Sequence, residues 1–290
     1  MMRRIFQLSM ICLIAGAASA CNSAEKIIAT EDIPTAGVRL INAVPDTAGA
    51  YGFDLRFVDM VENSTSFRIT FRNTPTTTAG IAGMGGAEYK PARAGSRHFV
   101  IFFDDSIQAI ASKIVKDTTV NLTAGKNYTA LLWGSARAGT MKLTFIEEAV
   151  PDPGTQVALR IINATTSAID ATQYLKGAAV PATNTWSNVA AMSVSSYVTT
   201  APGAIMYNVR AAGSATALFT DVQALLGSPA SSSAGTSVLD LAPIPGTSVA
   251  GSALTMVVFP ATTPGSRAAN FAAVGGAFMW DRRPPGVPGT

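Results

Sequence analysis

One short sequence occurs twice in this chain, and it constrains the fold more than any other feature. Residues 38–43 read Val-Arg-Leu-Ile-Asn-Ala, and residues 159–164 read Leu-Arg-Ile-Ile-Asn-Ala. Both segments are rich in the branched residues that favour strands. A Pro-Asp turn at 45–46 closes the first of them. The repetition predicts two copies of one β-rich unit.

Further strand candidates follow each of these openings. They share an alternating or continuously apolar pattern over strand length, and turn residues separate them. The first half has candidates at 54–58, 67–71, 98–103, 120–134 (a pair joined by a Gly turn) and 141–146, and the second half at 171–175, 193–198, 205–210, 238–241, 254–259 and 277–280. Residues 221–226 are expected to form one or two helical turns. The pattern predicts an all-β chain with two tandem Ig-like antiparallel β-sandwich domains.

The chain divides at points of changed composition. The expected parts are a signal peptide at 1–20, a lipidated tether at 21–36, sandwich domain 1 at 37–148, a linker at 149–155, sandwich domain 2 at 156–283 and a tail at 284–290. The linker contains two prolines and a glycine, which cannot continue a strand ladder. A length of 290 residues suits two domains that each bury a core.

The N-terminus has the order of a secretory signal. Arg3 and Arg4 form a basic start, residues 5–16 are mostly apolar, and residues 17–20 are small. The apolar run is shorter than the roughly 20 residues that a membrane-spanning helix needs. Cys21 follows the small residues directly, and this arrangement resembles a lipobox. We therefore expect cleavage between Ala20 and Cys21 and lipidation of Cys21, with an ordinary secreted protein as the alternative.

The expected lipid sets the expected compartment. Cys12 leaves with the signal, so Cys21 is the one cysteine of the mature chain and cannot form an internal disulfide. Acyl chains on Cys21 would hold the protein on a membrane through their buried methylenes. Asn22, rather than Asp, follows the cysteine, and by resemblance to sorted lipoproteins this favours the outer membrane. The predicted location is the cell envelope, lipid-anchored at the outer membrane, with the leaflet left open.

Charge argues against a nucleic-acid partner. Loss of Arg3 and Arg4 with the signal lowers the formal charge from +3 to +1, and the remaining basic residues are scattered among acids. Arg282 and Arg283, next to Asp281, are interpreted as a solvated edge.

Three segments together resemble a known family. Residues 38–46, 51–55 and 122–129 are similar to the domain-of-unknown-function 4397 family of secreted and envelope β-proteins. The similarity covers most of 37–148 and, more loosely, 156–283, so two tandem copies are expected. In the second copy, residues 165–167 replace the Pro-Asp turn. The resemblance implies a fold and a compartment, but no activity and no functional residue.

The sequence shows no catalytic, cofactor-binding or metal-binding constellation. The one histidine, His98, lies in an apolar run without a zinc-ligand spacing, and no Gly-x-Ser-x-Gly elbow is present. His98 is interpreted as a strand-edge residue. Asp104 and Asp105 are adjacent on a strand, point to opposite faces and cannot flank one glycosidic bond. We interpret them as a turn cap, with calcium as the alternative.

The aromatic residues fit either of two roles. Most are expected in the sandwich cores, although an exposed cluster could form a sugar-binding platform. The residues concerned are Tyr51, Phe53, Tyr89, Trp133, Trp186, Tyr197 and Trp280.

The sequence therefore predicts a non-enzymatic envelope lipoprotein with a binding, adhesion or scaffolding role. Its membrane contact would be the lipid on Cys21, and its further partner an envelope protein or a glycan. The alternatives are a hydrolase of envelope or extracellular polymer and a carrier of a small ligand or metal, for which a deep pocket with convergent polar groups would be the sign.

Overall fold

A computed structural model of the chain describes residues 33–46, 52–59, 68–69, 72, 88–230, 243–266 and 271–284. Residues Thr35–Thr290 form one compact unit. The predicted signal peptide, Cys21, most of the tether and the strand candidate at 238–241 lie outside the described residues.

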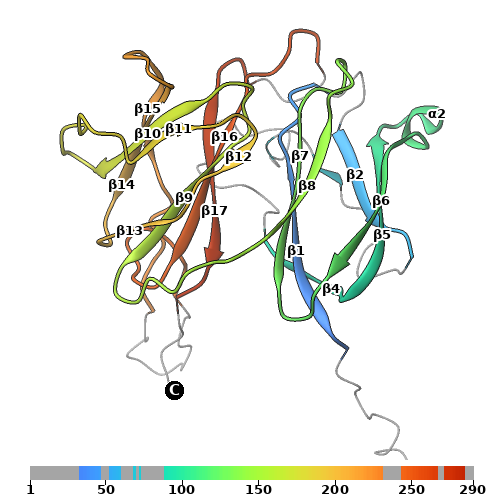
Figure 1. The fold of residues 1–290 in the computed structure, drawn as a ribbon, viewed down its shortest axis with the longest axis horizontal. Coiled ribbons are helices and arrows are strands. Elements are labelled where there is room, and N and C mark those ends of the chain that lie inside the picture. The colour runs from blue at the N-terminus through green and yellow to red at the C-terminus, as the bar shows by residue number, and fades with distance from the viewer. Residues whose placement is uncertain are drawn as a thin grey trace, which may run out of the picture. The chain divides into compact units, whose positions relative to one another are not determined.

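The described part of the first half is built almost entirely of strands (Figure 1). These are β1 (Thr35–Asn42), β2 (Gly52–Phe57), β3 (Arg68–Ile69), β4 (Lys90–Arg93), β5 (Gly95–Asp104), β6 (Ile114–Leu122), β7 (Asn127–Trp133) and β8 (Lys142–Glu147). One helical turn, α2 (Gln108–Ala111), joins β5 to β6.

The second half repeats this composition. Its described strands are β9 (Val157–Asn163), β10 (Ile169–Leu175), β11 (Trp186–Val189), β12 (Ser193–Val194), β13 (Val198–Thr200), β14 (Ile205–Ala211), β15 (Ala217–Gln223), β16 (Ala253–Phe259) and β17 (Gly275–Arg282).

The two halves have the same sheet topology. The sheets of the first half have the strand orders β4-β1-β7-β8 and β3-β2-β5-β6, and those of the second half β12-β9-β16-β17 and β11-β10-β14-β15, with β13 also paired to β9. Each sheet draws its strands from one half only. The predicted all-β sandwich class is confirmed.

One strand pair in each half is parallel. β1 pairs with β7 in parallel, and β9 pairs with β16 in the same way. Parallel neighbours need a long connection between them, and here several strands intervene in the sequence. The expectation of purely antiparallel sheets is corrected at these two pairs, and the other pairings are antiparallel.

Residues 221–226 are not helical, which corrects the expected helical turns. Ala217–Gln223 forms β15, with half-buried residues between exposed ones, and pairs with β14. Asp221 has φ 55°, outside the right-handed helical region. The strand candidate at 193–198 is interrupted: β12 and β13 pair separately with β9.

Asn42 and Asn163 hold equivalent positions at the ends of β1 and β9. Both are fully buried. The Oδ1 atom of Asn42 accepts the backbone N–H of Val44 at 3.0 Å, and that of Asn163 accepts the N–H of Thr165 at 3.0 Å. An Asx-type bond of this kind turns the chain out of the strand. The repeated asparagine therefore fixes the same turn twice, although the residues that follow it differ.

The central strands are buried on both faces. Val38 of β1 and Leu159 of β9 belong to the cores of their own sandwiches. Ile41 and Ile162, from the opposite faces of the same strands, belong to one shared cluster. β9 and β16 are buried along their whole length. This explains why these strands read as continuously apolar runs rather than alternating ones.

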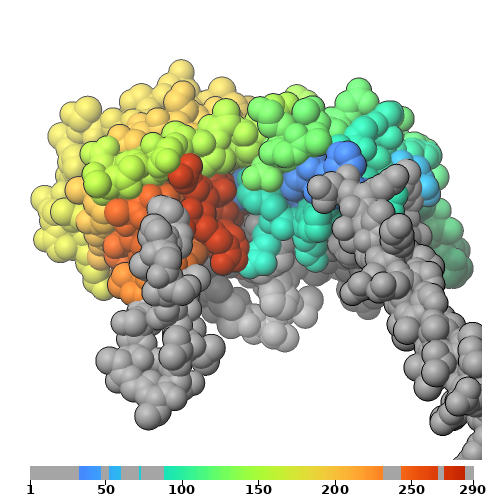
Figure 2. Space-filling view, turned by 90° about the horizontal axis from the view of Figure 1, so that it is seen from below, coloured from blue at the N-terminus to red at the C-terminus, as the bar shows by residue number. Residues whose placement is uncertain are grey.

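The chain enters and leaves this unit at one end. β1 begins there at Thr35, and β17 ends there at Arg282, which pairs with the first residue of β16. Figure 2 looks at this end and shows segments of β1 (blue) and β17 (red) on it. The loops that follow β1, β7, β9 and β16 lie at the opposite end.

Candidate functional site

The inner sheets of the two halves share an apolar cluster. Alternate residues of each strand contribute to it, because successive side chains of a strand point to opposite faces. Its buried members are Ile41, Ala43, Leu131, Trp133, Ile162, Ala164, Val257, Phe259, Ala277 and Met279. We call the contact that this cluster forms the inter-half interface.

A set of four buried charges adjoins the apolar cluster. Arg39 lies two residues before Ile41 on β1, and its Nη2 contacts Asp281 at 2.6 Å and Glu148 at 3.0 Å. Arg160 lies two residues before Ile162 on β9, and its Nη2 contacts Glu148 at 2.6 Å and Asp281 at 3.8 Å. The side chains of Arg39, Glu148 and Asp281 are fully buried, and that of Arg160 is 6% exposed. We call these four residues the charged quartet.

Threonines extend the quartet in the same way in both halves. Arg39 Nε donates to Thr129 Oγ1 at 2.7 Å, and Arg160 Nε donates to Thr255 Oγ1 at 2.7 Å. The Thr129 hydroxyl donates to Glu148. The Thr255 hydroxyl donates to Asp281 Oδ2 at 2.6 Å. The same hydrogen-bonding unit is thus built twice, and the arginines join the two copies across the interface.

A tyrosine ring covers each guanidinium. The Arg39 guanidinium carbon lies 4.4 Å from the centre of the Tyr89 ring, and that of Arg160 lies 4.7 Å from the centre of the Tyr197 ring. Tyr197 also donates its hydroxyl to Asp281 Oδ2 at 2.9 Å. Burial, followed by the nearby Asp281 carboxylate, raises the pKa of Tyr197. Burial alone would lower the pKa of Arg39, but Asp281, Tyr89 and Glu148 outweigh it and the pKa is raised. Both groups therefore keep their protons.

The quartet balances two positive and two negative charges away from water. Removing one member would leave a buried charge uncompensated, which is far more costly than losing an exposed pair. If one half shifted along the other by two residues, the charged side chains would lie against the apolar cluster. The quartet therefore fixes the register of the two halves, and the apolar cluster supplies the buried area.

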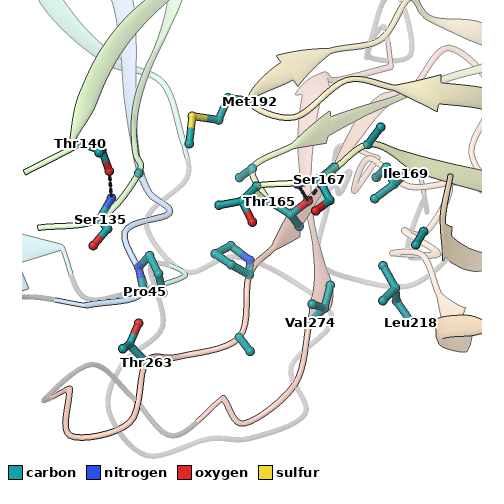
Figure 3. A pocket seen from close by; sticks show the side chains of 17 residues that line it. Pro45, Ser135, Thr140, Thr165, Ser167, Ile169, Met192, Leu218, Thr263 and Val274 are labelled. Carbon is teal, nitrogen blue, oxygen red and sulfur yellow. Dashed lines mark hydrogen bonds between the residues drawn. The ribbon is translucent and has the colours of Figure 1, made fainter. Parts of the chain in front are cut away.

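A cleft opens where the apolar cluster ends. It has a volume of about 480 Å³ and is lined by the loops after β1, β7, β9 and β16 (Figure 3). Its walls combine small and aliphatic side chains with hydroxyls, among them Pro45, Ser135, Thr165, Thr166, Ile169, Met192, Leu218, Ala261, Thr263 and Val274. Volume and lining fall in the range of small-ligand sites, which often lie between domains.

Hydrogen bonds hold the rim of the cleft. The buried Asp46 carboxylate accepts from Ser135 Oγ at 2.6 Å and from the Arg137 backbone N–H at 2.8 Å. The Arg137 guanidinium donates to the carbonyl oxygens of Pro264 at 2.9 Å and Gly265 at 2.6 Å. Arg137 thus ties a loop of the first half to a loop of the second.

The titratable residues singled out from the sequence do not meet in one site. His98 lies on β5, an interior strand of its sheet rather than an edge, and its Nε2 is 2.7 Å from Asp117 Oδ1 on β6. Asp104 is the last residue of the same strand. It lies six residues beyond His98, which corresponds to about 20 Å at the rise per residue of a strand. Asp105 accepts the backbone N–H of Ile107 at 2.9 Å, which confirms its role as a turn cap.

The three charged residues near the C-terminus, Asp281, Arg282 and Arg283, differ in their burial and in their contacts. Asp281 is 6% exposed and belongs to the quartet, although it directly precedes the arginine pair that the sequence predicts as a solvated edge. Arg282 does lie at the surface, where its guanidinium contacts Asp152 of the linker at 2.8 Å. The Arg283 guanidinium lies 4.2 Å from the Trp280 ring centre.

Half of the six singled-out aromatic residues that the structure describes lie in the interior, so the expectation that most are core residues is met only in part. Phe53, Trp133 and Trp186 are buried, whereas Tyr89, Tyr197 and Trp280 are half-buried. Tyr51 lies outside the described residues.

Among the described residues, no three His, Cys, Asp or Glu side chains lie together in a way that could hold a metal ion. Helices long and apolar enough for a membrane span are likewise not found in the part of the chain that the structure describes.

The fold and its paired sheets define an all-β sandwich protein. Residues 53–172 match the model of a family described as Domain of unknown function (DUF4397), which confirms the family resemblance. The match begins in β2 and ends in the equivalent strand β10, so it spans about one period of the repeat. A second copy of the family domain remains a prediction. No curated protein matches the chain.

Sequence reasoning missed the charged quartet, although a signal for it was present. An arginine stands at the same place in both repeats, inside an otherwise apolar strand. Its acidic partners are far away in the chain: Arg39 is separated from Glu148 by 109 positions and from Asp281 by 242. The sequence places Glu148 at the last position of predicted domain 1, and nothing in the sequence pairs it with either arginine.

Proposed function

We propose that this protein is a non-enzymatic lipoprotein of the cell envelope, anchored at the outer membrane through Cys21, with a binding or scaffolding role. The observation that carries the proposal is the layout of the unit. The chain enters at Thr35, and the 480 Å³ cleft opens at the far ends of the strands. The end of the unit that carries the cleft is therefore not the end at which the tether joins it.

The inter-half interface supports a role as a rigid body. Buried contacts between the halves include the quartet and the apolar cluster. A body that keeps its two halves fixed presents its loops in one geometry, which reduces the entropy lost on binding a partner.

The anchor is tested by changing the cysteine that would carry it. The Cys21→Ser variant of the full chain should lose incorporation of labelled palmitate and move from the membrane fraction to the soluble one. Wild-type protein that incorporates no palmitate, or a variant that still sediments with membranes, would contradict the lipoprotein proposal.

The non-enzymatic role is tested separately. Purified full-length protein should show no turnover of peptidoglycan, glycan, ester or peptide substrates, with or without divalent metal. The proposal fails if turnover survives repurification and is lost in His98→Ala or in the double variant Asp104→Asn/Asp105→Asn.

A second candidate function is that of a small-ligand carrier, which the cleft favours. Native mass spectrometry distinguishes the two. A carrier purified from cells should show the mass of the lipidated chain plus a bound small molecule, whereas a scaffold should show the mass of the lipidated chain alone.

A further inference from the structure

We propose that the cleft binds a neutral oligosaccharide. This inference rests on the proposed binding role and names the class of ligand. It follows from four observations: how the cleft arises from the interface, which side chains line its two sides, what its hydroxyls offer a ligand and how the two halves are linked beside it.

The cleft is the open continuation of the inter-half interface. Ala43, Trp133, Ala164 and Phe259 belong to the apolar cluster. The residues two positions further on are Pro45, Ser135, Thr166 and Ala261, and all four line the cleft. The strand faces that pack together in the apolar cluster therefore separate two residues further along the chain, where the cleft begins. The loops on the two sides are equivalent, but their side chains are not.

Both sides of the cleft combine aliphatic groups with hydroxyls. Figure 3 shows Ile169, Leu218 and Val274 on one side, with Thr165 and Ser167 beside Ile169. Ser135, Thr140 and Thr263 lie across from them, next to Pro45. A sugar ring has a face of C–H groups and a rim of hydroxyls. The aliphatic side chains of the cleft can cover the C–H face while its hydroxyls meet the rim.

The hydroxyls of the cleft differ in what they offer a ligand. Ser135 Oγ donates its proton to Asp46 Oδ2 at 2.6 Å and accepts the Ala138 backbone N–H at 3.1 Å, so one of its lone pairs is left to accept from a ligand. Thr165 is buried, and its Oγ1 is bonded to Asn163 and Ser167, whereas Thr166 is exposed in the cleft. The described residues that line the cleft carry no charge, so they fit a neutral ligand that brings hydroxyls of its own, as a sugar does.

The two halves are also linked beside the cleft. The exposed Arg137 donates to the carbonyl oxygens of Pro264 and Gly265, close in sequence to the lining residues Ser135 and Thr263. Contacts that join the halves before a ligand arrives reduce the rearrangement that binding requires.

The first test is a titration of the full chain in detergent with cellotriose, maltotriose, mannotriose and N-acetylchitotriose. Binding is followed by calorimetry and by tryptophan fluorescence, because Trp133 directly precedes the cleft residue Gly134. We expect saturable binding of at least one trisaccharide. Saturable binding of none of them overturns the proposal.

Two variants then locate the site. Ala261→Trp should fill the cleft and weaken binding at least about tenfold, whereas the matched Ala109→Trp on exposed α2 should leave it unchanged. Thr166→Val removes one exposed hydroxyl and should weaken binding about three- to tenfold. Unchanged binding in both cleft variants, with unfolding temperatures like that of the wild type, places the site elsewhere and overturns the proposal.

The result of the trisaccharide titration can be distinguished from the result of the test of the lipoprotein proposal. Protein that carries palmitate on Cys21 and stays with the membrane, but binds no trisaccharide, rejects this inference and leaves the lipoprotein proposal standing.

Discussion

The charged quartet and the apolar cluster are two regions of one interface that contribute in different ways. Both take equivalent residues from the two halves: Arg39 and Arg160 in the quartet, Ile41 and Ile162 in the cluster. Apolar contacts tolerate small shifts, because their energy follows buried area. Buried charges do not, because each must keep its partners. On the same strands, the apolar cluster therefore supplies the buried apolar area, and the charged quartet fixes how the two halves are aligned.

The largest effect is expected where the quartet loses one member. Asp281→Ala should lower the free energy of unfolding by about 3–5 kcal/mol, because it leaves buried arginines without one of their two acids. Denaturant unfolding followed by circular dichroism measures this change.

A double variant sharpens this comparison. Arg39→Met with Asp281→Leu removes one positive and one negative charge and keeps the contact of Arg160 with Glu148 at 2.6 Å. It should be less destabilised than Asp281→Ala alone, since no net buried charge remains. A double variant at least as unstable as the single one would show that the quartet is not electrostatically coupled.

The second effect is a loss of stability at alkaline pH. Tyrosines of the unfolded chain ionise near pH 10, while burial, followed by Asp281, holds the pKa of Tyr197 above that value in the folded state. Above pH 10 the folded state therefore retains more protons, and the free energy of unfolding falls as pH rises.

This decrease should be about 1.4 kcal/mol per pH unit for one such tyrosine. The difference between wild type and Tyr197→Phe isolates it, because ionisation of the other groups cancels. Equal slopes above pH 10 in the two proteins would contradict the burial of Tyr197 against the quartet.

Much of the fold could be predicted from the sequence, because it depends on local pattern. The repeated segments at 38–43 and 159–164 indicated β1 and β9, and the Gly turn within 120–134 indicated the break between β6 and β7. β15 was missed because its solvent-facing residues and irregular pairing at Asp221 hide the period of a strand. The short strands β4 and β11 carry too few residues for any period.

The site could not be predicted in the same way. The cleft depends on how two equivalent loops meet, and the quartet on contacts between distant segments. The sequence showed two arginines in equivalent strands, but only packing of the inner sheets brings both to Glu148 and Asp281.

The third effect lies in the apolar cluster and is smaller. Ile41→Val and Ile162→Val each remove one buried methyl group and should each cost about 0.5–1.5 kcal/mol in the free energy of unfolding. The two values should agree, since the positions are equivalent. Thermal unfolding of the pair tests this, and costs that differ by several-fold would show that the two faces are not packed alike.

The smallest effect is expected at the open end of the interface. Thr166 lies two residues beyond Ala164 and is exposed in the cleft. Thr166→Ala should change the free energy of unfolding by less than about 0.5 kcal/mol. A larger loss, measured in the same denaturant series, would mean that the cleft walls contribute to holding the halves together.

The central claim is that the two halves are joined into one cooperative unit, and tryptophan reporters test it most directly. Trp133→Phe leaves the reporters Trp186 and Trp280 in the second half, and Trp186→Phe/Trp280→Phe leaves Trp133 in the first. Equilibrium denaturation of each variant should give a single transition by fluorescence that coincides with its own transition by circular dichroism. A fluorescence transition in either variant that is separated from the transition by circular dichroism would show that the halves unfold independently and would contradict the claim.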